Sequence, residues 1–395
     1  MPAARRIAFI CPRFAEQGTV GGAETLLKAL AERAAADGRE VEFLTTCATN
    51  HFTWENTVPA GTRSIGALKV SFFPVDDDRD VTTFLTVQGR IDKGVKVSRA
   101  DEEAWIANSV NSRALIAYLR EHIGRFDRVV MGPYLFGVVY AASQVAPEKT
   151  VLVPCLHDEP FAYLSIIHDM FHRVGGLMFN LEPEKDLALR LYDLPERGTV
   201  VGMGIPDAPT DPNAFARKHR LPNPYVIYCG RREVLKGTPI LVAYLHAFRE
   251  RTGRALDFVF TGSGPIDPPD ELRPAIRDFG FVDESDKRQA MAGAVAFLHA
   301  SVNESFGIVL LEAWLSRTPA LVHANGVVLR DQCRRSGGGL WFRHYPDFEE
   351  CLLRLLDDPS LRQRLGESGR RYVLDRYNWT AVDRRLFAAL DGGAA

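Results

Sequence analysis

The sequence predicts an α/β protein built from two doubly wound, Rossmann-like domains. Short apolar runs of about four to seven residues recur along the 395-residue chain, and helical stretches with charged faces separate them. This alternation is typical of βα units that form a parallel sheet. A chain of this length also exceeds what one hydrophobic core usually supports, so two domains are expected.

The runs assign the expected elements in order. In the first half the strands are Ile7–Cys11, Val41–Thr45, Val70–Val75, Arg128–Met131, Val151–Leu156, Leu177–Phe179 and Val200–Met203, and the helices are Glu24–Ala35, Glu102–Glu121 and Glu184–Leu191. In the second half the strands are Tyr225–Cys229, Phe258–Thr261, Ile276–Val282, Val295–His299, Ala320–His323 and Leu340–Phe342, and the helices include Pro239–Arg251, Gly307–Leu315, Leu361–Asp375 and Ala381–Leu390. Each half therefore carries its own set of βα units.

A linker is expected at Gly204–Pro212, which is dense in proline and aspartate and lacks periodicity. The boundary divides an N-terminal domain, residues 1–205, from a C-terminal domain, residues 206–378. Residues 379–395 are expected to form a C-terminal helix that packs back on the N-terminal domain. Ligands of such sheets bind at the carboxyl ends of the strands, so the site is expected in a cleft between facing domains.

The composition is that of an ordinary globular protein and argues against several classes. Hydrophobic residues make up 46% and charged residues 25%, and the formal net charge is −2. No basic face for nucleic acid is therefore expected. The six cysteines form no Cys-x-x-Cys pair, which argues against a zinc knuckle or a disulfide framework and fits a cytoplasmic protein. These cysteines are Cys11, Cys47, Cys155, Cys229, Cys333 and Cys351.

Neither a signal peptide nor a membrane span is expected. The apolar run after Arg5 and Arg6 stops at Cys11, which is too short for a secretory signal. The most apolar long stretch, Val129–Ala146, is broken by Pro133 and is interpreted as strand, loop and helix.

A glycine-rich turn, Gly18–Glu24, follows the first expected strand and precedes an apolar-periodic helix. Glycines there let the backbone approach a phosphate, and the helix N-terminus adds the positive end of its dipole. Gly21 and Gly22 are therefore candidate donor-binding residues. The spacing is not Gly-x-Gly-x-x-Gly, and a tight turn that needs positive φ explains the glycines equally well.

Two cations, Arg231 and Lys236, follow the first strand of the second half within Gly230–Gly237. Cations just beyond a strand end can neutralise a diphosphate leaving group without a metal. A basic loop that is merely solvated remains an equal alternative for this segment alone.

The segment Glu304–Glu312 is the most informative. Ser305 is the expected N-cap of the following helix, and Gly307 keeps the first turn open. The backbone N–H groups from Phe306 to about Val309, including those of Gly307 and Ile308, would then point at a bound anion. The two carboxylates can reach opposite ends of a ligand roughly ten ångströms long, which is the extent of a nucleotide sugar. The alternative is a carboxylate that complements the helix dipole plus an exposed helical glutamate.

Two further turns follow strand ends. Gly262 begins Gly-Ser-Gly-Pro, and Phe281 and Val282 lie in Gly-Phe-Val-Asp. The second turn offers an apolar ring and backbone groups suited to hold a base, although an ordinary core strand is the stronger interpretation of that turn in isolation.

Taken together, these motifs resemble the retaining family 4 glycosyltransferases of GT-B fold. The Gly-Gly-Ala-Glu turn, Gly-Arg-x4-Lys-Gly, Gly-x-Gly-Pro, Gly-Phe-Val-Asp and Glu-x7-Glu occur in the family's order and separations, from Ile7 to about Trp379. The resemblance implies that Gly21 and Gly22 back the donor phosphate. It also implies that Arg231 and Lys236 hold the diphosphate.

For the ribose and the transferred sugar of the donor, the resemblance implies three further roles. Glu312 would bind the ribose hydroxyls. Glu304, with the amides of Phe306 and Gly307, would hold the transferred sugar. His157, which follows the strand Val151–Leu156, looks like the family's histidine that reaches the sugar, although a histidine at a strand end is more often structural.

The implied reaction moves a sugar, with retention and without a metal or other cofactor, from a UDP- or GDP-linked donor to a hydroxyl acceptor. The acceptor is a saccharide, a lipid-linked sugar or a small molecule, and the segment His51–Arg99 is its expected surface. Contact with the inner face of a membrane is expected only for a lipid-linked acceptor. A sugar-nucleotide epimerase, a glycoside phosphorylase and a non-catalytic sugar-nucleotide-binding subunit are the alternatives, and the phosphorylase lacks a candidate Schiff-base lysine.

Two features do not fit the family pattern. Asp76-Asp77-Asp78 formally matches the Asp-x-Asp metal motif of the other major transferase fold, but its surroundings indicate a polar loop. Residues 327–332 occupy the place where many relatives have Pro-Glu, and they are expected to form a loop at the donor end of the site.

Overall fold

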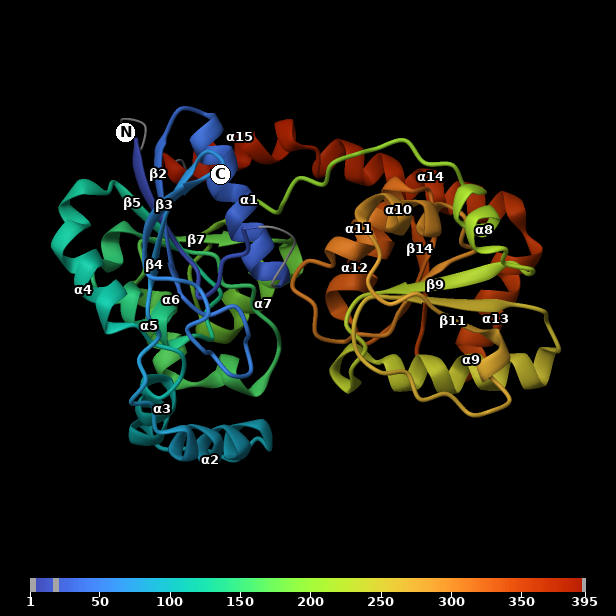
Figure 1. The fold of residues 1–395 in the computed structure, drawn as a ribbon, viewed down its shortest axis with the longest axis horizontal. Coiled ribbons are helices and arrows are strands. Elements are labelled where there is room, and N and C mark those ends of the chain that lie inside the picture. The colour runs from blue at the N-terminus through green and yellow to red at the C-terminus, as the bar shows by residue number, and fades with distance from the viewer. Residues whose placement is uncertain (1–4, 17–20, 393–395) are drawn as a thin grey trace. The chain divides into compact units, whose positions relative to one another are not determined.

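The structure is a computed structural model that describes residues 5–16 and 21–392. The chain divides into two compact units (Figure 1). Unit 1 holds the chain up to Met203 together with the segment from Val382 onward, and unit 2 holds Gly204–Ala381. The part Gly18–Val20 of the expected glycine turn lies outside the described residues.

The centre of unit 1 is a sheet of eight described strands in the order β3-β4-β2-β1-β5-β6-β7-β8. All neighbouring strands pair in parallel except β3 and β4, which form an antiparallel edge. The strands are β1 Arg6–Ile10, β2 Glu40–Thr46, β3 Gly61–Ile65, β4 Leu68–Phe73, β5 Arg128–Met131, β6 Thr150–Leu152, β7 Gly176–Phe179 and β8 Thr199–Val200.

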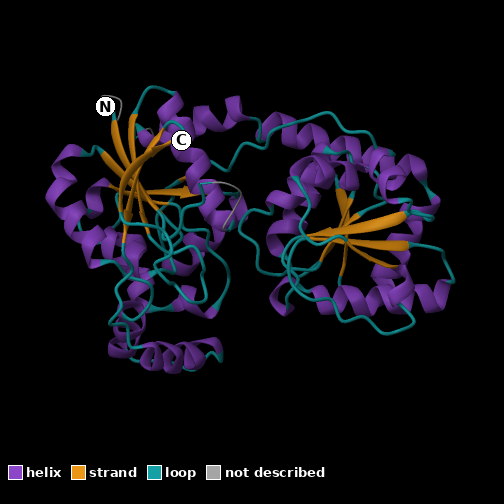
Figure 2. Ribbon diagram, in the orientation of Figure 1, coloured by secondary structure: helices purple, strands orange, loops and turns teal. Residues whose placement is uncertain are grey.

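Helices cover both faces of this sheet (Figure 2). They bury apolar stripes against it, with Leu115 and Leu119 of one helix and Phe171 of another fully enclosed. The helices are α1 Gly22–Ala36, α2 Val81–Asp92, α3 Arg99–Ala107, α4 Arg113–His122, α5 Gly137–Ser143, α6 Ser165–Arg173 and α7 Glu182–Tyr192, with the short turns η1 Ile123–Arg125, η2 Pro147–Lys149 and η3 Pro160–Tyr163.

The single helix expected over Glu102–Glu121 is wrong, because the chain forms α3 and α4 there. The Asn111 side-chain amide donates to the carbonyl oxygens of Ile106 and Ala107 and so caps the end of α3. The Ser112 hydroxyl accepts from the Leu115 N–H at 3.3 Å and starts α4. These two polar capping residues therefore divide the expected helix into α3 and α4.

Unit 2 is built on a fully parallel sheet of six described strands in the order β11-β10-β9-β12-β13-β14. The strands are β9 Tyr225–Cys229, β10 Asp257–Thr261, β11 Ile276–Asp278, β12 Phe297–His299, β13 Ala320–His323 and β14 Gly339–Phe342. The helices are α8 Ala214–His219, α9 Thr238–Thr252, α10 Glu284–Ala292, α11 Ile308–Leu315, α12 Val327–Ser336, α13 Tyr345–Asp357 and α14 Pro359–Arg376, with η4 Val234–Lys236 and η5 Arg273–Ala275.

Two expectations for unit 2 are corrected. The strand expected over Ile276–Val282 ends at Asp278, because the chain turns at Gly280, whose φ is +60°. The loop expected over residues 327–332 is the first part of α12. That helix begins after Gly326 and ends at Gly337, which caps it with φ +61°.

The last helix, α15 Trp379–Leu390, belongs to unit 1 from Val382 onward. Within unit 1, Arg33 Nε donates to Asp383 Oδ1 at 2.9 Å, and Arg385 donates to the Val201 carbonyl oxygen. Nowhere in residues 5–16 and 21–392 is a helix both long and apolar enough to span a bilayer.

Candidate functional site

The loops at the carboxyl edge of the unit 2 sheet gather most of the candidate residues. Backbone contacts hold three of these loops together: the Gly230 N–H donates to the Thr261 carbonyl at 3.0 Å, and the Gly262 N–H donates to the Gly280 carbonyl at 2.6 Å. Gly262 has φ +112°, and a Cβ there would lie 2.2 Å from the Gly230 oxygen. Gly262 therefore lets two loops cross at van der Waals contact.

Arg232, and not its neighbour Arg231, ties these loops together. Its side chain is 5% exposed, and Nε donates to the Gly264 carbonyl while Nη1 contacts Asp278 Oδ1, each at 2.7 Å. Arg231 has a 54% exposed side chain whose Nη1 lies 3.2 Å from Glu233 Oε1. The more exposed arginine is thus the one that can reach a ligand.

Lys236 and Glu304, which are far apart in sequence, meet at this edge. Lys236 Nζ contacts Glu304 Oε1 at 2.6 Å, and both side chains are about four-fifths buried. His299, at the end of β12, places Nε2 3.5 Å from the same oxygen. Its Nδ1 accepts from the Ser301 N–H at 3.2 Å, which leaves Nε2 to donate, and burial lowers the pKa of the imidazole. A lysine and a histidine therefore orient one carboxylate.

The N-cap of α11 is Gly307 and not Ser305, so the sequence expectation is wrong at this position. Gly307 has φ +77°, and a Cβ there would lie 2.6 Å from Leu329 Cδ2. The Phe306 ring is buried edge-to-face against Tyr377 with ring centroids 5.4 Å apart. The N–H groups of Ile308 and Val309, which precede the first helical hydrogen bond from Leu310 to the Gly307 carbonyl, have no partner within the helix and create a positive end beside Glu304.

Glu312 lies inside α11 and forms the second carboxylate of the site. Its Oε1 contacts Lys287 Nζ of α10 at 3.0 Å, and Lys287 also contacts Glu284 at 2.8 Å. Burial raises the pKa of the Glu312 carboxyl, and the Lys287 ammonium opposes this rise in part. Glu312 Oε2 is buried without a hydrogen-bond partner among the described residues. Glu312 Oε2 is thus an acceptor that a ligand hydroxyl could satisfy.

Exposed apolar side chains surround these polar groups. The Phe281 side chain is 80% exposed, so it is no part of a core strand, and Val282 is half-buried beside it. Other large apolar side chains exposed near this edge are Val234 and Leu235 in η4, Val302 in the loop after β12, and Val327 at the start of α12. Exposed apolar side chains gathered at one edge of a sheet indicate a surface that contacts a ligand or a partner.

Gly21 of unit 1 is explained by a buried ion pair. Gly21 precedes α1 with φ 168°, which is extended backbone, so the positive φ considered for the glycines of this turn does not apply to it. A Cβ at Gly21 would lie 2.3 Å from Glu24 Oε2, and Glu24 pairs with Arg13. A Cβ at Gly22 would meet no described atom within 4 Å. Gly21 therefore has a packing role, whereas phosphate binding by both glycines stays a prediction.

His157 lies in the loop that follows β6, which is shorter than expected. β6 ends at Leu152 because Pro154 cannot donate to the sheet, and His157 is a quarter exposed with Nδ1 3.6 Å from Glu159 Oε1. The buried Glu184 of α7 accepts from the N–H groups of Leu156 and Asn180 at 2.7 and 2.6 Å. Glu184 thus holds the backbone beside His157.

Burial raises the pKa of Glu184 to about 7 from the ordinary value of 4.5. The native state keeps the proton to higher pH than the unfolded chain, so unit 1 loses stability as pH rises from about 4.5 to about 7. The loss attributable to Glu184 is about 3 kcal/mol at 1.36 kcal/mol per pKa unit. Urea unfolding at pH 5 and pH 7.5 measures this loss. Between these two pH values, the free energy of unfolding of Glu184→Gln should rise relative to that of the wild type by an amount of this order. The exposed Glu182→Gln is the matched control, and a parallel pH response of both variants contradicts the assignment.

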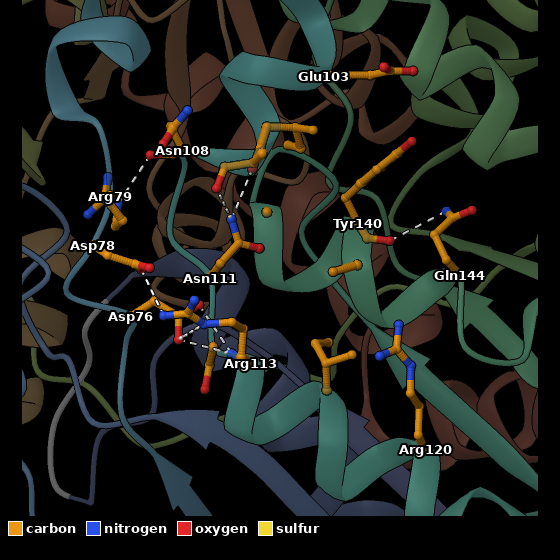
Figure 3. Close-up of a pocket in the computed structure, with 16 residues that line it drawn as sticks. Asp76, Asp78, Arg79, Glu103, Asn108, Asn111, Arg113, Arg120, Tyr140 and Gln144 are labelled. Atoms are coloured by element: carbon orange, nitrogen blue, oxygen red, sulfur yellow. Dashed lines mark hydrogen bonds and ion pairs between the residues drawn. The ribbon is translucent and has the colours of Figure 1, made fainter.

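No group of three or more metal-binding side chains is found in the described part of the chain. Asp76 and Asp78, from the motif that resembles a metal site, lie in the loop between β4 and α2 and contact Arg113 (Figure 3).

The family model "Glycosyl transferases group 1" matches residues 210–372, which cover the unit 2 loops described above. Alpha-D-kanosaminyltransferase from Streptomyces kanamyceticus is 30% identical over 279 residues, which are 68% of this chain and 66% of that protein.

The chain belongs to the glycosyl transferases group 1 family.

A second relative in this family is D-inositol 3-phosphate glycosyltransferase from Corynebacterium glutamicum (strain R), which is 28% identical over 53% of this chain and 55% of its own length. The chain thus matches about half to two thirds of the length of these curated relatives. The family resemblance seen in the sequence is confirmed.

Solved structures of low identity share the fold. Sucrose-phosphate synthase from Thermosynechococcus elongatus has a TM-score of 0.71 at 18% identity, over 98% of this chain and 100% of its own. Anabaena Alr3699/HepE in complex with UDP-glucose has a TM-score of 0.68 at 16% identity, over 98% and 99%. The predicted GT-B class, with two α/β sheets, is confirmed.

The sequence analysis did not single out three residues of this cluster: Lys287, His299 and Arg232. Lys287 lies in a polar helix between Asp286 and Arg288, so nothing local distinguishes it. The sequence gives one indirect indication of Lys287: Glu312 is an acidic residue inside a buried apolar helix, and such a residue requires a cation from another element.

Proposed function

We propose that the protein transfers a sugar from a nucleoside-diphosphate sugar to a hydroxyl acceptor, with the donor held at the carboxyl edge of the unit 2 sheet. The observation that carries the proposal is the buried, unpartnered Glu312 Oε2. A buried acceptor without a donor is costly, and the hydroxyls of a ribose are donors of suitable size and chemistry.

The positive charge near Lys236, at the end of the cluster away from Glu312, suits a diphosphate leaving group. Lys236 and Arg231 are two of the cations of this edge, and the N-terminus of α11 supplies further positive potential. These groups can stabilise the negative charge that develops on the departing diphosphate, which gives the reaction an electrostatic path without a resident metal. The Phe281 ring offers an apolar face for the base.

A UDP-linked donor and a retaining outcome are the finer parts of the proposal. The similar fold of Alr3699/HepE, solved with UDP-glucose, favours uridine over guanosine. In a retaining transfer the acceptor attacks from the face that the nucleotide leaves, and the phosphate itself takes the acceptor proton. Glu304, oriented by Lys236 and His299, would hold the transferred sugar.

A binding panel tests the proposal directly. UDP, GDP, ADP and their common sugar conjugates are added to the purified protein with EDTA, and unfolding is followed by calorimetry. A ligand at a hundredfold excess over its Kd adds about 2.7 kcal/mol of stability. Selective stabilisation by uridine nucleotides supports the proposal. No response to any nucleotide contradicts it, and isomerisation of the donor without transfer would assign an epimerase.

Glu312→Gln should weaken UDP binding by about ten- to a hundredfold, because a hydrogen bond to a charged acceptor contributes about 1.5–3 kcal/mol. Glu284→Gln is the matched control, since Glu284 contacts the same Lys287 but is 68% exposed. Titration calorimetry with UDP measures both variants. Equal affinity in the wild type and in Glu312→Gln would remove Glu312 from the nucleotide site.

A further inference from the structure

Glu312 is a carboxylate in apolar surroundings. Its side chain is 12% exposed, and its chain neighbours Leu311 and Ala313 are fully buried. Taking a charge out of water is costly unless a group of opposite charge lies close to it. The position of Glu312 in α11 therefore requires a cation from another element.

Lys287 supplies that cation from α10. Its Nζ lies 3.0 Å from Glu312 Oε1 and 2.8 Å from Glu284 Oε1, and its side chain is 18% exposed. Glu284 and Lys287 are three residues apart on α10, so they share one face of that helix. The ammonium is thus fixed between a buried carboxylate and an exposed one.

The charged and titratable groups that face Glu312 come from α10 and β9. Burial raises the pKa of the Glu312 carboxyl, Lys287 and more weakly Arg288 lower it, and Glu284 raises it. Burial raises the pKa of Cys229, at the end of β9, to about 12, so this group is a neutral thiol. Burial lowers the pKa of Lys287, but the charges of the two carboxylates outweigh this and raise it. Lys287 is therefore the main group that keeps Glu312 ionised.

The same contact orients the carboxylate of Glu312. Lys287 holds Oε1, whereas Oε2 is buried without a hydrogen-bond partner among the described residues. A hydrogen bond to an ionised acceptor is roughly twice as strong as one to a neutral acceptor. A ligand hydroxyl at Oε2 would therefore meet a charged acceptor in a fixed direction.

We propose that Lys287 is a positioning residue that makes the nucleotide site select ribose hydroxyls, because it holds Glu312 ionised with Oε2 turned toward them. This role rests on the proposed function, from which the ribose as ligand of Glu312 is taken. Lys287 acts on the nucleotide through Glu312 and not by a contact of its own.

A double-mutant cycle with UDP tests this route of action. Lys287→Met should weaken UDP binding about tenfold in titration calorimetry, because Glu312 loses the charge that keeps it ionised. In the Glu312→Gln background the same substitution should change the Kd by less than about twofold, since a neutral amide needs no counter-charge. An equal loss in both backgrounds overturns the proposal, because Lys287 would then act on the nucleotide or on the fold directly.

Two further variants support the cycle. Lys218→Met is the matched control, because Lys218 pairs with Asp286 of the same helix but is 56% exposed, and the variant should bind UDP as the wild type does. Lys287→Gln can still donate a hydrogen bond to Glu312 but carries no charge, so it replaces Lys287→Met in the cycle if thermal unfolding shows that the latter does not fold.

Selectivity distinguishes positioning from a general loss of structure. The wild type should bind UDP about tenfold or more tightly than 2′,3′-dideoxy-UDP, which lacks both ribose hydroxyls. In Lys287→Met this ratio should fall to about threefold or less, whereas a damaged site would lose affinity for both nucleotides alike. A ratio that stays at the wild-type value in a folded Lys287→Met overturns the proposal.

The titration of Glu312 can be measured without a nucleotide. In ¹³C NMR of the nucleotide-free protein, the carboxyl signal that disappears in Glu312→Gln should titrate about one pH unit or more higher in Lys287→Met than in the wild type. UDP binding by this variant should accordingly weaken at a higher pH than wild-type binding as the pH falls. An unchanged midpoint overturns the role of Lys287 alone if the wild type binds UDP. No UDP binding by the wild type overturns the proposed function and leaves Lys287 no ribose to select.

Discussion

Lys236→Met should lower kcat/KM for nucleotide release from the donor by about 10²–10³, the loss seen when one charge-stabilising group is removed from a reaction centre. Methionine keeps most of the apolar stem and removes only the ammonium that lies 2.6 Å from Glu304. Because that charge is needed most when the diphosphate departs, kcat should fall more than the affinity for UDP.

Lys218→Met is the control for this experiment. Lys218 contacts Asp286 in the same unit, but its side chain is 56% exposed, so its removal should leave the rate within about twofold, as for exposed ion pairs. Lys236→Arg should restore part of the lost rate. Thermal unfolding of all three variants separates a loss of rate from a loss of folding, and a folded Lys236→Met with the wild-type rate would exclude the role.

Most strand positions could be predicted from the sequence, and the predicted bounds of β5, β9 and β13 are confirmed, whereas the ends of β6 and β11 could not be predicted. The apolar runs locate β6 and β11 because burial on both faces of a parallel sheet demands such runs. A run continues past the end of its strand when other burial keeps its side chains apolar. Val153 and Leu156 are buried although β6 ends at Leu152. The apolar pattern therefore indicates burial and not strand length. For β6, only Pro154 indicated where the strand ends.

The sequence does not reveal α2, because this helix buries few of its apolar side chains. Its Val81 and Leu85 are about half exposed, so the helix shows no clear apolar face in the sequence. The antiparallel β3 is largely polar and lies at the sheet edge, where one row of neighbours is absent. Elements at the edge of a fold bury little and leave a weak pattern.

The members of the unit 2 cluster could be named from motifs, but their partners could not. Glu304 and Glu312 stand out by spacing, whereas the contact of Glu304 with Lys236 joins residues 68 positions apart. Such pairs depend on strand order, which places β9 beside β12 and so brings the loops after both strands together. Sequence spacing identifies chemistry within one loop, and topology decides which loops meet.

Gly21 shows how one residue pattern can serve two purposes. The turn before α1 was interpreted as phosphate-binding, yet a side chain at Gly21 would strike the carboxylate of Glu24. Loss of activity in a Gly21 variant therefore cannot by itself establish a phosphate contact. Gly22→Ala is the more selective probe, because no described atom lies within 4 Å of its added Cβ.

Glu24→Gln should destabilise unit 1 by about 3–5 kcal/mol, because it leaves a buried guanidinium without its counter-charge. Arg13 and Glu24 are only 8% and 6% exposed, Arg13 Nε donates to Glu24 Oε1 at 2.9 Å, and Arg13 Nη1 also donates to the Thr49 carbonyl at 3.2 Å. The pair thus fixes the start of α1 to the loops after β1 and β2, and urea unfolding measures its loss.

The double variant Arg13→Met/Glu24→Leu distinguishes a charge penalty from a packing defect. If desolvated charge dominates, replacing both partners by apolar groups should recover most of the stability that Glu24→Gln loses, since a buried pair often contributes little relative to apolar residues of similar volume. Glu32→Gln, an exposed site on the same helix, should change stability by less than about 0.5 kcal/mol. A double variant as unstable as Glu24→Gln would mean instead that the geometry of this pair, including its contact with the Thr49 carbonyl, holds the turn that carries Gly21 and Gly22.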